Sequence, residues 1–130
     1  MPHHRPSRYL ELIGPPYETA TDAAVVGLHI DDRHTNARGF LHAGVLVAVA
    51  DVVMGHTAHR VGGSGDGLVT ASLTTDFLGS AHLGDWVQGV ATVRRVGRQL
   101  AFTACEFTAA GRPLLAASGI FATVTRSAHS

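Results

Sequence analysis

The chain has 130 residues, enough for one domain that buries a substantial hydrophobic core. Ten arginines balance ten acidic residues and there is no lysine, so the zero net charge argues against general binding to nucleic acids or membrane surfaces. The longest apolar run is too short to span a bilayer, and the first residues lack the apolar region of a secretory signal. The single cysteine, Cys105, excludes an intrachain disulfide. We therefore expect a cytoplasmic protein with one domain over residues 1–130.

The first part of the chain predicts short elements. Ser7 to Ile13 predicts a short helix, part of a lead-in over residues 1–13, and Gly14-Pro15-Pro16 ends it. The stretch from Ala23 to Ile30 favours a strand, because it is rich in β-branched residues and lies between acidic residues. Tyr17 to Ala20 gives a weaker signal for another strand.

The stretch from Asn36 to His59 predicts the helix around which the chain is organised. The helix is expected to start near Leu41, and the run from Val45 to Met54 is apolar except for one carboxylate, Asp51. Apolar residues occur on every side of the run, which predicts a helix enclosed by other structure. A carboxylate in such a place is costly unless it is paired or has a task.

A glycine-rich loop, Gly62 to Gly67, follows the helix, and after it the pattern becomes extended. Short turn sequences separate long extended stretches, which implies antiparallel strands that follow one another in a meander. One enclosed helix with such a sheet predicts an α+β fold in which the sheet curls around the helix. The four predicted strands are Leu68 to Leu78, Asp85 to Val96, Gln99 to Ala109 and Leu114 to Thr125.

The motif Asn36-x-x-Gly39-x-x-His42-Ala43-Gly44, followed by Asp51 in the same helix, resembles the hotdog-fold acyl-CoA thioesterases. Within them it is closest to the phenylacetate-degradation branch, which is similar to 4-hydroxybenzoyl-CoA thioesterases. The stretch LVTASLTTDFLGSAHLGD (68–85) resembles the second segment of that branch, and RRVGRQLAFTACEFT (94–108) resembles its hairpin. The resemblance covers the chain after Ile13. It implies a hotdog fold, a curled antiparallel sheet around one long central helix.

The resemblance also implies an activity, the hydrolysis of an acyl- or aryl-CoA thioester to a free acid and coenzyme A. Coenzyme A is then part of the substrate, and no separate cofactor is expected. Asp51 can act as a nucleophile or as a general base on water, and the sequence does not distinguish these roles. Free N–H groups around Ala43 and Gly44, aided by the helix dipole, can stabilise the oxyanion, and Gly39 allows a sharp entry into the helix.

The resemblance assigns further roles in the site. It implies that Asn36 and His42 position water or the thioester, and that the hydroxyl of Thr70 orients the water. The oxyanion donor of the family is the backbone N–H at the position of Ala43. The family usually has His-Gly-Gly where this chain has His-Ala-Gly; alanine keeps the N–H, while its methyl group narrows the approach to the thioester.

Helix geometry places His42 and Asp51 apart. Nine residues of helix put them on opposite faces and about 13 Å apart along the axis, so one helix cannot bring its own N-terminus and its own Asp51 to one carbonyl carbon. If both act, two copies of the helix lie antiparallel across a two-fold axis. The expected assembly is a homodimer or a dimer of dimers.

Two segments are expected to contact coenzyme A. Arg94, Arg95 and Arg98 cluster at one hairpin, where guanidinium groups suit phosphate oxygens, although a solvated turn explains the cluster equally well. The resemblance places the nucleotide near this hairpin and near the segment at the end of the first long strand. The residues assigned to the contact are Arg95, Gly97, Arg98, Phe77, Leu78, Gly79, Ser80, Ala81 and His82.

Other interpretations of these residues remain open. Asp51 can be a buried polar residue satisfied in the core, Asn36 a turn residue and His42 a helix-start residue. No metal site is predicted, because His56 and His59 share a helix face without an acidic or cysteine partner at a recognisable spacing.

Two alternative functions remain open. One is a hotdog-fold acyl-thioester hydratase or dehydratase, whose His-Phe-Pro-Gly or Asp-x-Asn-Pro patterns are absent. The other is a non-catalytic module that binds acyl-CoA, for which a carboxylate at the thioester has no use. The acyl group stays undetermined, since Phe77, Met54 and Trp86 suit either an aromatic or a medium aliphatic chain.

Overall fold

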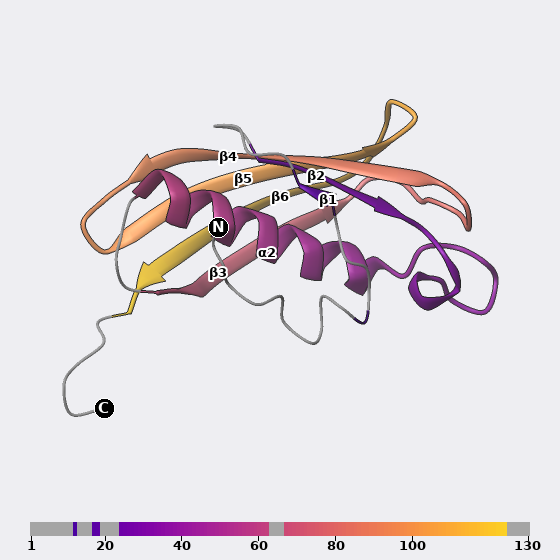
Figure 1. Ribbon diagram of the computed structural model, residues 1–130, viewed down its shortest axis with the longest axis horizontal. Helices are drawn as coiled ribbons and strands as arrows, with labels where there is room; N and C mark the ends of the chain where they lie inside the picture. The colour runs from indigo at the N-terminus through magenta and orange to yellow at the C-terminus, as the bar shows by residue number, and fades with distance from the viewer. Residues whose placement is uncertain (1–11, 13–16, 19–23, 63–66, 125–130) are drawn as a thin grey trace.

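The computed structural model describes residues 12, 17–18, 24–62 and 67–124 (Figure 1). The predicted helix over Ser7 to Ile13, except Leu12, and most of the loop from Gly62 to Gly67 lie outside these residues. In chain order the elements are β1 (Tyr17–Glu18), β2 (Ala24–His29), the 3₁₀ helix η1 (Asp32–His34), α2 (Ala43–Gly62), β3 (Leu68–Phe77), β4 (Trp86–Val96), β5 (Leu100–Ala109) and β6 (Arg112–Thr123).

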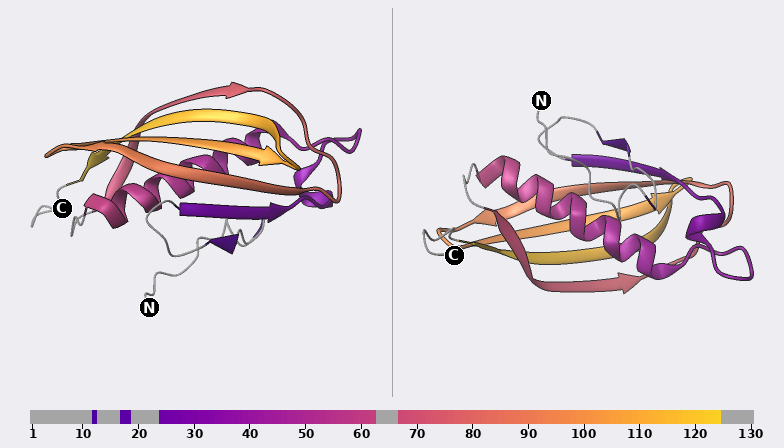
Figure 2. Two further views of the ribbon diagram at one scale, coloured as in Figure 1. Left: turned by 90° about the horizontal axis from the view of Figure 1, so that it is seen from above. Right: turned by 60° about the horizontal axis from the view of Figure 1, so that its bottom comes forward.

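The strands form one antiparallel sheet in the order β1-β2-β4-β5-β6-β3. The sheet curves along α2, which lies against one of its faces (Figures 1 and 2). The prediction of an α+β fold with a curled sheet around one long helix is confirmed, and the four long strands pair antiparallel as expected. The predicted meander is right for β4, β5 and β6 but wrong for β3, which pairs with β6 and not with β4, because the connection from β3 to β4 passes beside the start of α2. Among the described strands, β3 is therefore an edge strand.

Two local features differ from the prediction. Strand β6 begins at Arg112, two residues early, because Ala110 and Gly111 alone make the turn with φ values of 50° and 80°. The 3₁₀ helix was not predicted, since it depends on side-chain caps and not on apolar periodicity. The carboxylate of Asp31 accepts from the N–H of Arg33, and Nδ1 of His34 accepts from the N–H of Asp31. The hydrogen bond from the Arg33 side chain lowers the pKa of Asp31 to about 2.

Helix α2 is enclosed on one side only within a single chain, which corrects the expectation of apolar cover all round. The face toward the sheet is buried and consists of Val45, Leu46, Val49, Ala50, Val53, Met54, Thr57 and Ala58. The opposite face, which we call the open face, is partly exposed and includes Val47, Ala48, Asp51 and Val52. An apolar strip that is only half covered is suited to a further packing partner.

Residues that alternate along β4, β5 and β6 fill the space under the helix. Gly89 leaves room for the ring of Phe107, because a Cβ at this position would lie 2.4 Å from the ring. Cys105 points to the same side and is 3% exposed. Burial, with a smaller contribution from Glu106, raises the pKa of the Cys105 thiol to about 12.

The buried thiol predicts a loss of stability in alkali. Because the folded chain keeps the thiol neutral while the unfolded chain ionises it near pH 9, the free energy of unfolding should fall between pH 9 and pH 12. The expected slope is about 1.4 kcal/mol per pH unit from this group. Denaturant titrations at several pH values should show a smaller slope for Cys105→Ala than for the wild type. An equal slope would contradict the prediction.

Candidate active site

Asp51 lies in the third turn of α2 and is held from β3. The hydroxyl of Thr70 donates a hydrogen bond of 2.6 Å to Oδ1 of Asp51. Asp51 is half-buried and Thr70 is exposed, so the pair lies on the open face of α2, toward the free edge of the sheet. The carboxylate keeps its second oxygen for another partner.

A β-bulge turns Thr70 toward the helix. Thr70 pairs with Phe121, and Ser72 pairs with Ile120, which is adjacent to Phe121 in β6. Ala71 is therefore an extra residue in β3. Simple alternation counted back from Leu73, which packs against the core, would place Thr70 on the other face of the sheet. The bulge changes the phase and brings both side chains to the helix side.

The start of α2 exposes one backbone donor. The N–H of Gly44 donates to Nδ1 of His42 at 3.1 Å, and the N–H of Val45 donates to the carbonyl of His42 at 3.0 Å. The N–H of Ala43 makes no hydrogen bond with any part of the chain that the structure describes. Of the two donors expected from the sequence, around Ala43 and Gly44, the one at Ala43 is therefore free and the one at Gly44 is used.

Asn36 and His42 both have partners near them in the chain. The side-chain oxygen of Asn36 accepts from the N–H groups of Arg38 at 2.9 Å and Phe40 at 3.2 Å, so it forms a turn. The turn includes Gly39, whose φ of 83° makes the sharp entry that was expected. The side chain of His42 is exposed and caps the helix through Nδ1, which leaves Nε2 for the proton.

The segment from Phe77 to His82 lies beside the start of α2. The N–H of Leu41 donates to the carbonyl of Ala81 at 2.8 Å, and the rings of Phe40 and His82 lie 4.8 Å apart. Arg112, which the sequence placed in a turn, donates to the carbonyl of Ser80 at 3.0 Å and holds the segment to β6. No sequence signal marks this role of Arg112, since it depends on two turns that meet only in the fold.

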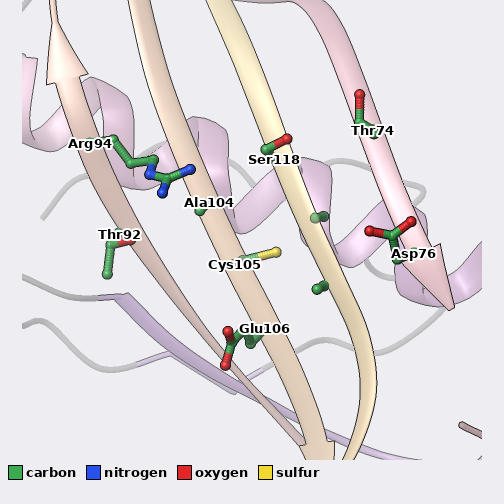
Figure 3. A pocket seen from close by; sticks show the side chains of 10 residues that line it. Thr74, Asp76, Thr92, Arg94, Ala104, Cys105, Glu106 and Ser118 are labelled. Atoms are coloured by element: carbon green, nitrogen blue, oxygen red, sulfur yellow. The ribbon is translucent and has the colours of Figure 1, made fainter. Parts of the chain in front are cut away.

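The predicted arginine cluster is divided between two grooves. Arg95, Gly97 and Arg98 line a groove of about 500 Å³ with Gln99, Leu100 and Phe102. Arg94 is the extra residue of a bulge in β4 and points instead over the outer face of the sheet. There Arg94 and Asp76 line opposite sides of a shallow groove whose floor includes Ala104 and Ser118, with Asp76 offset from Arg94 along the strand direction (Figure 3). Neither groove contains Asp51, Thr70 or Ala43.

The two segments expected to contact coenzyme A lie at opposite ends of one chain. The β4–β5 hairpin is near the C-terminal end of α2, whereas the segment after β3 is near its N-terminal end (Figure 1). Counted along the paired strands, Arg98 and Phe77 are more than about 20 Å apart. Ala43 and Asp51 are about 12 Å apart along the helix axis.

Within residues 24–62 and 67–124, no three histidine, cysteine or acidic side chains gather as metal ligands would. None of the described helices has the length and apolarity needed to cross a bilayer.

The sequence profile described as "Thioesterase superfamily" matches residues 38–116, more than half of the chain. This chain belongs to the thioesterase superfamily. The matched region of the chain contains α2 and strands β3, β4 and β5, together with Asp51, Thr70 and Ala43.

A curated relative agrees with this membership, and solved structures agree with the fold. The chain is 34% identical over 122 residues to "Putative esterase PA0474" of Pseudomonas aeruginosa, with 92% of this chain and 91% of the relative covered. The PaaI protein of the phenylacetic acid degradation operon of E. coli superposes with a TM-score of 0.80 at 20% identity, over 92% of this chain and 86% of the other. Smu.793 of Streptococcus mutans, solved bound to acetyl CoA, superposes with a TM-score of 0.77 at 19% identity, over 84% of this chain and 88% of the other. The chain therefore has the hotdog fold that the resemblance implied.

Proposed function

We propose that this protein hydrolyses an acyl- or aryl-CoA thioester to a free carboxylic acid and coenzyme A. The observation that carries the proposal is the half-buried carboxylate of Asp51, which Thr70 orients from β3. Asp51 lies on the same helix that presents the free N–H of Ala43. The superfamily membership supports a hydrolase of this class. Smu.793 binds acetyl CoA on the same fold, which supports coenzyme A as the carrier of the acyl group.

In the proposed reaction Asp51 attacks the thioester carbonyl or removes a proton from the water that attacks it. Negative charge then develops on the carbonyl oxygen, where the N–H of Ala43 and the positive end of the α2 dipole stabilise it. The collapse of the intermediate breaks the C–S bond and releases coenzyme A as the thiolate. If Asp51 acts as the base, the proton that it took from water passes to the thiolate; if Asp51 attacks directly, water then hydrolyses the mixed anhydride on Asp51 to give the free acid. Thr70 holds one oxygen of Asp51, so that the other faces the substrate.

The site needs two chains. Since Ala43 and Asp51 of one helix are about 12 Å apart along the axis, one carbonyl carbon cannot contact both. The open face of α2 and the unpaired edge of β3 lie next to each other and include Asp51 and Thr70. We therefore infer a homodimer in which Asp51 of one chain meets Ala43 of its partner, with two equivalent sites. A dimer of dimers is compatible with this arrangement.

The same arrangement accounts for the two segments assigned to coenzyme A. They lie at opposite ends of one chain, so an antiparallel partner brings the hairpin of one chain toward the segment after β3 of the other. We propose that Arg95, Gly97 and Arg98 contact the phosphates and that residues 77–82 contact the rest of the carrier.

The test is a panel of acyl-CoA substrates, linear and aromatic, with a reagent that traps the released thiol. Because Cys105 is buried, the protein itself contributes little signal to this assay. Hydrolysis by the wild type that exceeds that of Asp51→Ala supports the proposal, and equal rates across the panel would refute it. Hydration of a 2-enoyl-CoA in the same panel would indicate a hydratase. Tight binding by calorimetry without turnover would indicate a binding module.

Replacing Thr70 by valine should lower kcat by about tenfold, because the isosteric side chain no longer donates to Asp51 and the carboxylate loses its fixed orientation. Thr70→Ser keeps the hydroxyl and should stay within a few-fold of the wild type. Steady-state kinetics of the three proteins check this. A serine variant as slow as the valine variant would argue against the role of the hydroxyl.

A further inference from the structure

The imidazole of His42 is the cap of helix α2. Nδ1 accepts a hydrogen bond of 3.1 Å from the N–H of Gly44, the second residue of the helix. The backbone of His42 is fixed as well, since its N–H donates to the carbonyl of His34 at 2.8 Å and its carbonyl accepts from Val45 at 3.0 Å. A side-chain acceptor for the second or third N–H defines an N-cap, a position that serine, threonine, aspartate and asparagine usually occupy.

Gly44 provides the space in which this cap fits. A Cβ at Gly44 would lie 3.2 Å from Nδ1 and 3.4 Å from Cε1 of His42, closer than most real contacts. Any side chain at this position therefore displaces the imidazole. The spacing His-x-Gly in the sequence is explained by this contact, because the ring occupies the volume that a side chain would take.

The cap determines which donor is left for a ligand. The N–H of Gly44 is bound to the imidazole and that of Val45 to the carbonyl of His42, whereas that of Ala43 has no partner in the described chain. Ala43 lies between the two residues that the cap connects, so the direction of its N–H is fixed by the same hydrogen bond. The imidazole itself need not touch the reacting atoms to have this effect.

We propose that His42 is a positioning residue: by capping Gly44 through Nδ1, it aims the N–H of Ala43 at the carbonyl oxygen of the thioester. The inference rests on the proposed function and adds to it the means by which the oxyanion donor is oriented. This role requires the neutral tautomer of His42 with its proton on Nε2, because Nδ1 accepts a hydrogen bond.

The test compares His42→Asn with His42→Phe. Asparagine is an efficient N-cap and can accept from the same N–H, whereas phenylalanine keeps a ring but has no acceptor. We expect the phenylalanine variant to lose about 10- to 100-fold in kcat with little change in KM, because the donor is misaimed. The asparagine variant should recover most of that loss. An asparagine variant as slow as the phenylalanine variant would overturn the proposal, since the imidazole would then act directly.

A second measurement does not depend on catalysis. The amide proton of Gly44 should be shifted downfield and protected from exchange in the wild type and in His42→Asn, and neither shifted nor protected in His42→Phe. Gly44→Ala, which keeps every donor and displaces the ring, should show a weakened hydrogen bond and an intermediate kcat. An amide signal unchanged in all variants would overturn the cap. A wild type that hydrolyses no substrate while the amide signals follow this order would refute the proposed function and leave the cap intact.

Discussion

Asp51→Ala is expected to reduce thioester hydrolysis by about 10²- to 10⁴-fold, the range over which a positioned acid or base contributes to catalysis. The variant removes the only carboxylate on the open face of the described helix α2 and leaves Thr70 without its acceptor. Thermal stability should change little, since the pair is partly exposed. The rate of thiol release and the unfolding midpoint of the purified variant check both statements.

Asp76→Ala is the matched control. Asp76 lies on the same strand as Thr70 but on the outer face of the sheet, where it lines the groove shown in Figure 3. This variant should hydrolyse the substrate at the wild-type rate. If both alanine variants lost activity equally, the effect would follow from damage to β3 or from net charge, and Asp51 would not be the catalytic group. Asp51→Asn is a weaker control, because slow deamidation restores the acid.

Ala43→Pro should remove the oxyanion donor without breaking the helix. Proline has no N–H and is favoured at the first position of a helix, which Ala43 occupies in α2. Loss of a single oxyanion donor is expected to lower kcat by about 10²- to 10³-fold. Circular dichroism should report an intact helix. Wild-type kcat in this variant would show that the N–H of Ala43 does not take part.

Mixing the two inactive variants tests whether the site is shared between chains. In a heterodimer of Asp51→Ala and Ala43→Pro, one site combines the intact Asp51 of one chain with the intact Ala43 of its partner. Denaturing and refolding the variants together at equal amounts should therefore restore about a quarter of the wild-type activity, as random pairing gives heterodimers with one working site. If the mixture stayed as inactive as each variant alone, Asp51 and Ala43 would not combine across chains.

Periodicity was sufficient to predict most of the fold. The apolar run predicted α2 to within about two residues at its start, and alternation predicted the four long strands, because each element repeats its pattern over ten or more residues. The elements that were missed depend on single contacts. The 3₁₀ helix exists because Asp31 and His34 cap it, and the bulge at Ala71 is one extra residue in an otherwise regular strand.

The sequence indicated which residues belong to the candidate site better than it indicated which of them contact one another. Asp51 was singled out because a carboxylate in an apolar helix is unusual in sequence, and Ala43 was assigned by resemblance to the motif of the family. That Thr70 faces Asp51 follows from the bulge, which alternation alone does not reveal. Asn36 and His42 were assigned to the substrate by resemblance, and the sequence did not reveal that Oδ1 of Asn36 and Nδ1 of His42 accept from nearby backbone N–H groups. Such short-range hydrogen bonds depend on local torsion angles that no spacing rule specifies.

The unpaired side of β3 has a consequence for the handling of the protein. A ten-residue edge with a single charged side chain, Asp76, offers its free backbone groups to any extended chain and carries little that repels one. Newly made chains would be most at risk of aggregation before this edge is covered. If a second copy covers this edge, association stabilises the folded chain. The melting temperature should then rise with protein concentration and fall on dilution.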